Sequence, residues 1–236
     1  RFGDRVHKHL FNGGALTPEA NAQRWLRRAD EIDLAVIAES ARWGDYRRDM
    51  HSYSSGPYYL YTKNGYWLPE KQRLLNQYFP YRTANALNQF KTLGLYPSVE
   101  APVFRVNGSA QHGGAISKNS SFSMTAPTGT MWLTLDGSDP RIGGAARSSG
   151  ISPYAIRYTG PIALPHSAPV KARALNSGTW SALNEATYAV GPVAENLRIT
   201  EIMYHPQAAP DANDPNEEFI ELTNIGTQTI NLNLVR

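Results

Sequence analysis

The first hundred residues carry apolar side chains at the spacing of an amphipathic helix. We predict a helix from Pro18 to Trp43, capped by Thr17, because Thr favours the N-cap and Pro the first helical position. Residues 1–11 are predicted to be the last turns of another helix, which the glycine pair at 13–14 ends. The apolar residues of the long helix lie mostly three or four positions apart, namely Ala22, Trp25, Leu26, Ala29, Ile32, Val36 and Ile37.

The rest of this segment is predicted to hold a turn and two shorter helices. Asn64-Gly65 lies between aromatic runs, which is a typical signal of a β-hairpin turn. A short helix is predicted over residues 69–78, and Pro80 should end it. Thr83 is predicted to cap a further helix.

Residues 101–192 change to short apolar runs separated by Gly, Pro, Ser and Asn. Seven strands are predicted, at Val103–Val106, Ser121–Met124, Met131–Leu135, Ala155–Tyr158, Pro161–Leu164, Val170–Leu175 and Ala186–Val190. About seven short strands in about 90 residues is the spacing of a β-sandwich.

Residues 197–236 also alternate apolar with polar side chains and predict strands. The first run contains Ile199, Ile202 and Tyr204, and the second contains Phe219 and Ile220. The final INLNLVR is predicted to be another strand. Two or three strands do not close a sandwich by themselves. We therefore expect this domain to be truncated, or completed by another copy or a partner.

Charge is distributed unevenly along the chain, which has a net charge of +3. The chain contains no cysteine. Residues 1–100 carry +4, residues 101–195 carry +3 and residues 196–236 carry −4. The arginines are scattered along helical stretches rather than clustered, so no nucleic-acid partner is expected. No apolar run reaches the ~18 residues of a membrane helix, so no membrane span is expected. The absence of cysteine excludes disulfides, thiolate metal sites and cysteine nucleophiles.

The stretch LTLDGSDPR, residues 133–141, places two acids around a Gly-Ser pair directly after a predicted strand. Asp136 and Asp139 are candidate ligands of Ca²⁺, although this ion takes six to eight oxygen ligands and two carboxylates are too few. The other interpretation is a tight turn, with Asp at its start and Gly at a positive φ. The turn explains more of these residues and is preferred.

A richer set of oxygen donors lies between the last two clear strand patterns. Five side chains in eight residues could bind a calcium ion, namely Asp211, Asn213, Asp214, Glu217 and Glu218. An exposed acidic loop is the simpler interpretation and is preferred.

Aromatic residues of the second segment are candidates for sugar binding. Trp132 and Trp180 lie there with Tyr154 and Tyr158. We expect one Trp and one Tyr to lie in the core, because sandwiches bury such residues. A glycan platform on Trp132 and Trp180 is the alternative.

The remaining polar groups favour structure over catalysis. Asp30, Glu31 and Asp33 lie on the polar face of the long helix and are expected to be solvated charges. His7 and His9 are two positions apart on a helix, so they point to different sides and do not form a metal pair. The chain has no glycine-rich phosphate loop. No catalytic or cofactor-binding residue is predicted.

Sequence blocks in all three segments resemble known families. LTLDGSDPR, YTGPIAL, VKARAL and GTWSALNEATY follow one another over about 120–190 and resemble the Ig-like or fibronectin-III-like domain at the C-terminus of chitobiases and β-hexosaminidases. ITEIMYHP followed by NEEFIELTNIG is similar to the opening of a lamin-tail domain. HLFNGGALTPEANAQRW, ADEIDLAVIAESARWGD and LLNQYFPYRT resemble the C-terminal part of the spore-coat CotH kinase-like family.

These resemblances imply an α+β multidomain chain. Residues 1–100 would be the helical part of a CotH kinase-like module, 101–192 an Ig-like β-sandwich and 197–236 a partial lamin-tail β-sandwich. They imply an exported bacterial protein, extracellular or at the cell surface. The segment would be non-catalytic and would serve spacing, attachment or assembly with other domains or surface proteins.

Two alternatives stay open. The helical segment would complete an atypical CotH-like kinase, for which the resemblance implies ATP and Mg²⁺ bound by residues N-terminal to this chain. In the second alternative the Ig-like domain would be a carbohydrate-binding accessory domain.

Overall fold

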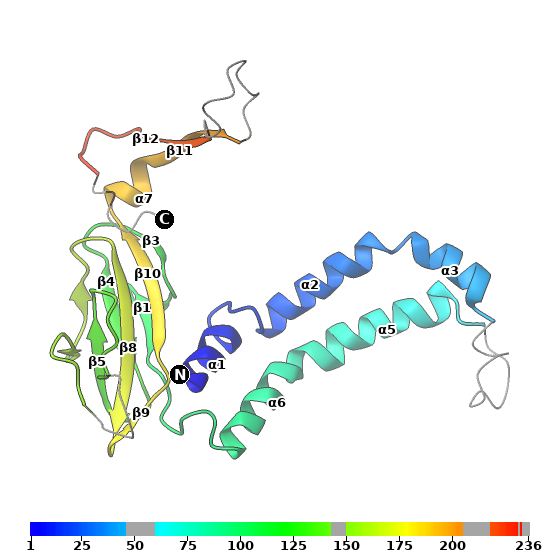
Figure 1. The fold of residues 1–236 in the computed structure, drawn as a ribbon, viewed down its shortest axis with the longest axis horizontal. Helices are drawn as coiled ribbons and strands as arrows, with labels where there is room; N and C mark the ends of the chain where they lie inside the picture. Colours follow the sequence, from blue (N-terminus) through cyan, green and yellow to red (C-terminus); the bar gives the residue numbers. More distant parts are fainter. Residues whose placement is uncertain (46–59, 143–149, 205–217, 231, 233–236) are drawn as a thin grey trace, which may run out of the picture. The chain divides into compact units, whose positions relative to one another are not determined.

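Figure 1 shows the computed structural model, which describes residues 1–45, 60–142, 150–204, 218–230 and 232. The chain divides into two compact units, Arg1–Tyr96 and Pro97–Arg236. The first unit is helical and the second contains the β-sheets, which confirms the predicted combination of helices with a β-sandwich. Among the described helices, none has the length and apolar character needed to cross a bilayer.

The helical unit consists of two arms that run side by side (Figure 1). Its helices are α1 (Phe2–Leu10), α2 (Pro18–Glu31), α3 (Ala35–Trp43), α5 (Leu68–Arg73) and α6 (Phe79–Thr92), with π-helical turns η1 (Lys63–Trp67) and η2 (Leu74–Tyr78). Helix α2 contacts α6, and α3 contacts η1. Aromatic rings fill the space between the arms, since Trp25 lies 6.2 Å from Trp67 and 6.1 Å from Phe79 between ring centroids.

The predicted start of the long helix is confirmed, but its continuity is not. Thr17 caps α2, and its hydroxyl accepts a hydrogen bond from the backbone N–H of Ala20. The helix ends at Glu31, because Ile32 leaves helical geometry and the Asp33 N–H donates to the Asp30 carbonyl. The apolar spacing continues across this interruption, so it predicts one helix where the backbone makes two.

The predicted hairpin turn at Asn64-Gly65 is wrong. The Thr62 hydroxyl accepts a hydrogen bond from the Gly65 N–H at 3.0 Å and so caps the helical turn η1. A capped helical start competes with the turn signal. It prevails here because η1 leads directly into α5.

The predicted roles of Pro80 and Thr83 are also wrong. Pro80 lies in the first turn of α6, where a missing N–H costs least, and the wider turn η2 precedes it. Pro80 therefore sits in a continuous helical path. Thr83 lies inside α6, and its hydroxyl donates to the Leu16 carbonyl at 2.6 Å.

The second unit contains a two-sheet sandwich (Figure 1). The smaller sheet has the order β2 (Ser109–Ala110), β1 (Val103–Val106), β4 (Ser121–Thr125), β7 (Ile162–Ala163). The larger sheet has the order β3 (Gly114–Ile116), β10 (Asn184–Val190), β8 (Ala168–Asn176), β5 (Thr130–Thr134), β6 (Ile156–Arg157), and β9 (Thr179–Trp180) pairs with β8. All of these pairs are antiparallel except β3 with β10. All seven predicted strands are confirmed, with boundaries that differ by at most two residues.

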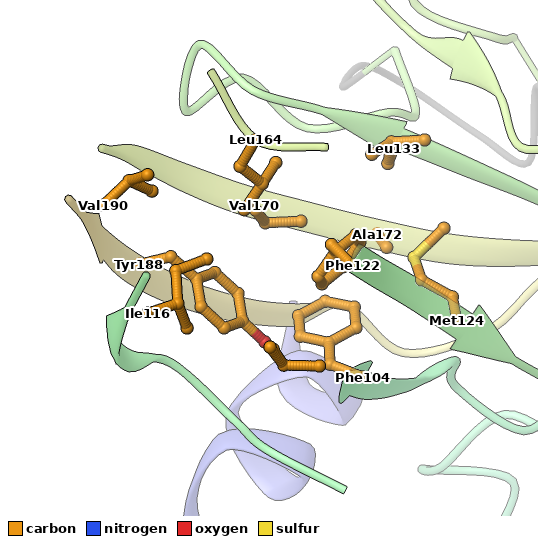
Figure 2. Packing of buried hydrophobic residues seen from close by; sticks show 11 residues of the cluster. Phe104, Ile116, Phe122, Met124, Leu133, Leu164, Val170, Ala172, Tyr188 and Val190 are labelled. Atoms are coloured by element: carbon orange, nitrogen blue, oxygen red, sulfur yellow. The ribbon is translucent and has the colours of Figure 1, made fainter. Parts of the chain in front are cut away.

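The core lies between the two sheets, as Figure 2 shows. Phe122 packs edge-on against Phe104 and Tyr188, with 5.4 Å between ring centroids in each pair. Leu133 and Val170 are fully buried with them. Each such side chain contributes about 1.5–3 kcal/mol by leaving water, so this cluster is the main stabilising element of the sandwich.

A separate hairpin follows the sandwich. Helix α7 (Pro192–Asn196) leads into β11 (Leu197–Met203), which pairs antiparallel with β12 (Phe219–Asn224). Both strand predictions are confirmed. The third predicted strand, at residues 230–236, lies largely outside the described residues, so that prediction is open.

Candidate functional site

The LTLDGSDPR stretch forms a tight turn after β5. The carboxylate of Asp136 accepts hydrogen bonds from the backbone N–H and the hydroxyl of Ser138, at 2.9 and 2.6 Å. These bonds hold the pKa of Asp136 below its ordinary value. Gly137 adopts φ +83°, which glycine tolerates best. The geometry is that of the predicted turn.

The second acid of the stretch forms an ion pair with Arg173 of β8. Arg173 donates from Nε and Nη2 to the two oxygens of Asp139, both at 2.7 Å, and from Nη1 to the Ser181 carbonyl at 2.8 Å. Only 1% of the Arg173 surface is exposed. Its neighbour Ala172 belongs to the core, so Arg173 lies on the outer face of the sheet. The turn therefore joins β5 to β8 through a buried arginine.

The environment of Asp139 favours its charged form. Burial acts to raise the pKa of this carboxyl, but the Arg173 guanidinium and the Arg141 backbone N–H outweigh it and hold the pKa below its usual value. Both oxygens already accept charge-assisted hydrogen bonds. The contacts of Asp139 are those of a structural ion pair.

The calcium predictions stay open. Within the described residues, no group of three or more His, Asp or Glu side chains is placed to hold a metal ion. Asp136 and Asp139 have the contacts given above. Four of the other candidates, Asp211, Asn213, Asp214 and Glu217, lie outside the described residues, and Glu218 is exposed directly before β12.

The candidate sugar-binding aromatics have different environments. Trp180 is only 7% exposed, Trp132 is half-buried, and the Tyr158 hydroxyl accepts a hydrogen bond from the Met124 N–H at 3.1 Å. Tyr154 is exposed. The expectation of one buried Trp is met by Trp180, and the half-buried Tyr158 packs against the core cluster. Sugar binding at Trp132 and Trp180 stays a prediction.

The acids of the predicted long helix lie at the surface, and each of them forms an ion pair. Asp30 pairs with Lys71 at 2.6 Å and Asp33 with Lys63 at 2.5 Å. These two ion pairs join residues that are 41 and 30 positions apart, and therefore link the two helical arms. Glu31 pairs with Arg28 within its own helical region. Asp30 lies at the surface, as predicted, and Asp33 is partly exposed, but helix spacing shows only the face of a residue and not its ion-pair partner.

The β11–β12 hairpin has one apolar face and one face on which most side chains are polar. Cross-strand pairing places Ile199 opposite Leu222 and Ile202 opposite Ile220. On the other face the Thr200 hydroxyl bonds to the Glu221 carboxylate. Residues 199 and 202 are an odd number apart, and the register shift between them returns both to one face.

The apolar face of the hairpin is open in the described structure. Ile199, Ile202 and Ile220 are 60–64% exposed and Leu222 is 40% exposed. Each strand pairs only with the other among the described residues, so both outer edges are also open. We call the four side chains the hairpin face. The sequence predicted the strands, but the bulge that aligns the hairpin face was missed.

Comparison with known proteins bears on the sandwich. A family described as Fn3 associated has a model that matches residues 122–188. The match runs from β4 to β10 and includes the turn at Asp136 and the Asp139–Arg173 pair. No curated protein and no solved structure matches the chain. The match supports the predicted fibronectin-III-like domain, while the resemblances of the outer segments stay predictions.

Proposed function

We propose that this chain is a non-catalytic structural and interaction segment of an exported bacterial surface protein. The observation that carries the proposal is the open hairpin face, because an isolated two-stranded hairpin is marginally stable in water at best. Covering four side chains that are about half exposed would contribute roughly 4 kcal/mol, at about 2 kcal/mol for a complete side chain. A partner therefore gains substantially by covering this face.

The proposed occupant is a set of β-strands from a partner polypeptide. Two hairpins face to face offer too little area, since strands of six or seven residues spaced by about 4.8 Å present a patch of roughly 20 by 10 Å. Two such patches cover on the order of 400 Å², well below the ~1,200 Å² of a stable interface. Strands that pair with the open edges and continue into a covering layer supply both hydrogen bonds and area.

The resemblances and the family match support this proposal. The Fn3-associated match lies in the sandwich, and that type of domain suits an accessory role. Resemblance to a lamin-tail opening favours completion of the hairpin into a larger β-domain. The combination with a CotH-like helical segment is the basis for proposing an exported, cell-surface location.

Hydrogen exchange followed by mass spectrometry tests the open hairpin. We expect amides of β11 and β12 to exchange much faster than those of β8 in the isolated chain, and the chain to be monomeric by light scattering. Ile202→Lys should reduce binding of the dye ANS, which reports exposed apolar surface, whereas Thr223→Lys on the polar face should not. Amide protection in the hairpin equal to that in β8 would contradict the proposal. A stable dimer would show instead that a second copy of this chain covers the hairpin face.

The kinase alternative rests on the helical unit. Several of its apolar side chains are strongly exposed, including Leu34, Tyr81 and Leu93, which favours packing against a further domain. Titration with ATP and Mg²⁺ by calorimetry separates the two functions. We expect no binding by this chain, and Mg²⁺-dependent binding would support the kinase alternative instead.

A further inference from the structure

The two outer edges of the β11–β12 hairpin differ in how well they can accept a further strand. Strand β11 changes register between Ile199 and Glu201, and a bulge of this kind twists an edge away from an incoming strand. Strand β12 pairs without interruption from Phe219 to Asn224 and contains neither proline nor lysine, two residues that commonly protect an edge. Among the described residues, no second strand pairs with β12. The β12 edge is therefore the one that can best accept a strand.

Two glutamates lie opposite each other on the face of the hairpin on which most side chains are polar. Glu201 of β11 is the cross-strand partner of Glu221 of β12, and both side chains are exposed. Like charges directly opposite each other destabilise a pair of strands, because their Cβ atoms are only about 5 Å apart. The hydroxyls of Thr200 and Thr223 donate to the Glu221 carboxylate and hold it in place. The hairpin therefore presents a positioned negative group beside the β12 edge.

Neither glutamate forms an ion pair among the described residues. The two strands contain one basic residue, Arg198. Its guanidinium donates to the carbonyls of Leu197 and Glu195 at 2.8 and 2.7 Å, and is thus bound to the backbone at the start of β11. A positive charge supplied by a partner would therefore relieve the repulsion between the two glutamates.

We propose that one strand of the partner pairs with the β12 edge and alternates apolar residues with lysine or arginine. Side chains on one face of this strand would extend the hairpin face beside Ile220 and Leu222. Those on the other face would lie beside Glu221, where a Lys or Arg would form a cross-strand ion pair. The inference rests on the proposed function, because it names the chemistry of a strand that completes the open hairpin.

The overall charge of the chain would favour the opposite kind of partner. The chain has a net charge of +3, so unspecific attraction would select an acidic strand. A preference for a basic strand therefore reports the local charges of the hairpin.

Binding of two labelled peptides to the complete chain tests the proposal by fluorescence anisotropy. Val alternates with Lys in one peptide and with Glu in the other, and both carry the same neutral dye. At about 50 mM salt the lysine peptide should bind about tenfold more tightly than the glutamate peptide, and at about 1 M salt the difference should nearly disappear through screening. Hydrogen exchange in β12 should slow when the lysine peptide is bound.

Glu221→Lys should abolish the preference for the lysine peptide. The same change pairs a cation with Glu201 across the strands, so in the free chain the hairpin amides should exchange more slowly than those of the unchanged protein. Glu100→Lys is the matched control, since Glu100 is an exposed acid of the same unit outside the hairpin. It changes the net charge equally and should leave the preference intact.

The proposal is overturned if the two peptides bind equally, if neither binds, or if Glu221→Lys leaves the preference unchanged. Equal binding of both peptides would leave the proposed function intact, because strands would then be added without selection by charge. The proposed function fails separately, when the hairpin amides of the free chain are as protected as those of β8.

Discussion

Arg173 shows at the residue scale how one charge can organise a β-sandwich. It is 1% exposed on the outer face of its sheet, and its hydrogen bonds join β8 to the turn after β5 and to Ser181. A buried ion pair adds little net stability compared with apolar residues of the same shape, but loss of one partner leaves a buried charge uncompensated. Asp139 and Arg173 should therefore be sensitive to single substitutions.

Asp139→Ala should lower the free energy of unfolding by about 3 kcal/mol. Lys171→Met is the control, because Lys171 pairs with Glu185 across 3.6 Å at a more exposed position. That substitution should cost about 0.5 kcal/mol. Urea unfolding followed by tryptophan fluorescence measures both. Equal costs for the two variants would show that Arg173 does not depend on its carboxylate partner.

Asp139 should also make the stability of the sandwich depend on pH. Its pKa in the folded state lies below the value of about 3.9 expected in an unfolded chain. A depressed carboxyl pKa contributes stability above the unfolded pKa, and this stability is lost as the pH falls through the folded pKa. The melting temperature of the sandwich should therefore fall more steeply between pH 7 and pH 2 for the unchanged chain than for Asp139→Asn. Parallel curves would be incompatible with this role.

Substitution of two glycines tests the cost of backbone strain separately from the cost of a steric clash. Gly108 and Gly129 have φ values of +82° and +85°. A Cβ on Gly108 meets no atom within 4 Å, whereas a Cβ on Gly129 would lie 2.6 Å from the Leu175 carbonyl oxygen. Gly108→Ala should cost about 1–2 kcal/mol through its backbone conformation alone. Gly129→Ala should cost clearly more, because the pairing of β5 with β8 must shift, and equal denaturation midpoints would contradict this.

At the scale of elements, local sequence signals account for much of the fold. Thr17-Pro18 starts a helix, and each longer strand is an apolar run bounded by turn residues. The strands that were missed, β2, β3 and β9, have only two or three residues and no apolar alternation. Where two local signals compete, as at Thr62 and Asn64-Gly65, the sequence does not decide between a capped helix and a turn.

The contribution of the N-cap residue Thr17 to the stability of α2 can be tested by substitution. Thr17 is buried and accepts a hydrogen bond from a first-turn N–H, so Thr17→Ala should cost about 1 kcal/mol. Thr92→Ala is the control, since the Thr92 hydroxyl only donates to a carbonyl one turn earlier at an exposed position. That change should be nearly neutral. Thermal melting at 222 nm compares them, and identical midpoints would exclude a capping role.

At the scale of the whole molecule, sites arise from residues that are distant in sequence. Asp139 and Arg173 are 34 positions apart, and Trp25 of α2 packs against Trp67 of η1. Composition and spacing identify each residue as an acid at a turn or an aromatic on a helix, but not its partner. The sequence therefore predicted the turn around Asp136 correctly, whereas the ion pair of the buried Arg173 and the hairpin face required the three-dimensional arrangement.

The two compact units should also unfold separately. The sandwich has a continuous core around Phe122 and Tyr188, whereas the buried apolar side chains among the described residues of the helical unit are few and include Val6, Leu10 and Ala29. Buried apolar area is the main source of cooperativity and stability, so the helical unit should melt first.

Calorimetry should thus show at least two transitions, and loss of the circular dichroism signal at 222 nm should coincide with the first. Asp139→Ala should shift only the second transition, because both members of the ion pair lie in the sandwich unit. Thr17→Ala should shift only the first for the corresponding reason. A single transition that both substitutions lower together would mean that the units fold as one cooperative body.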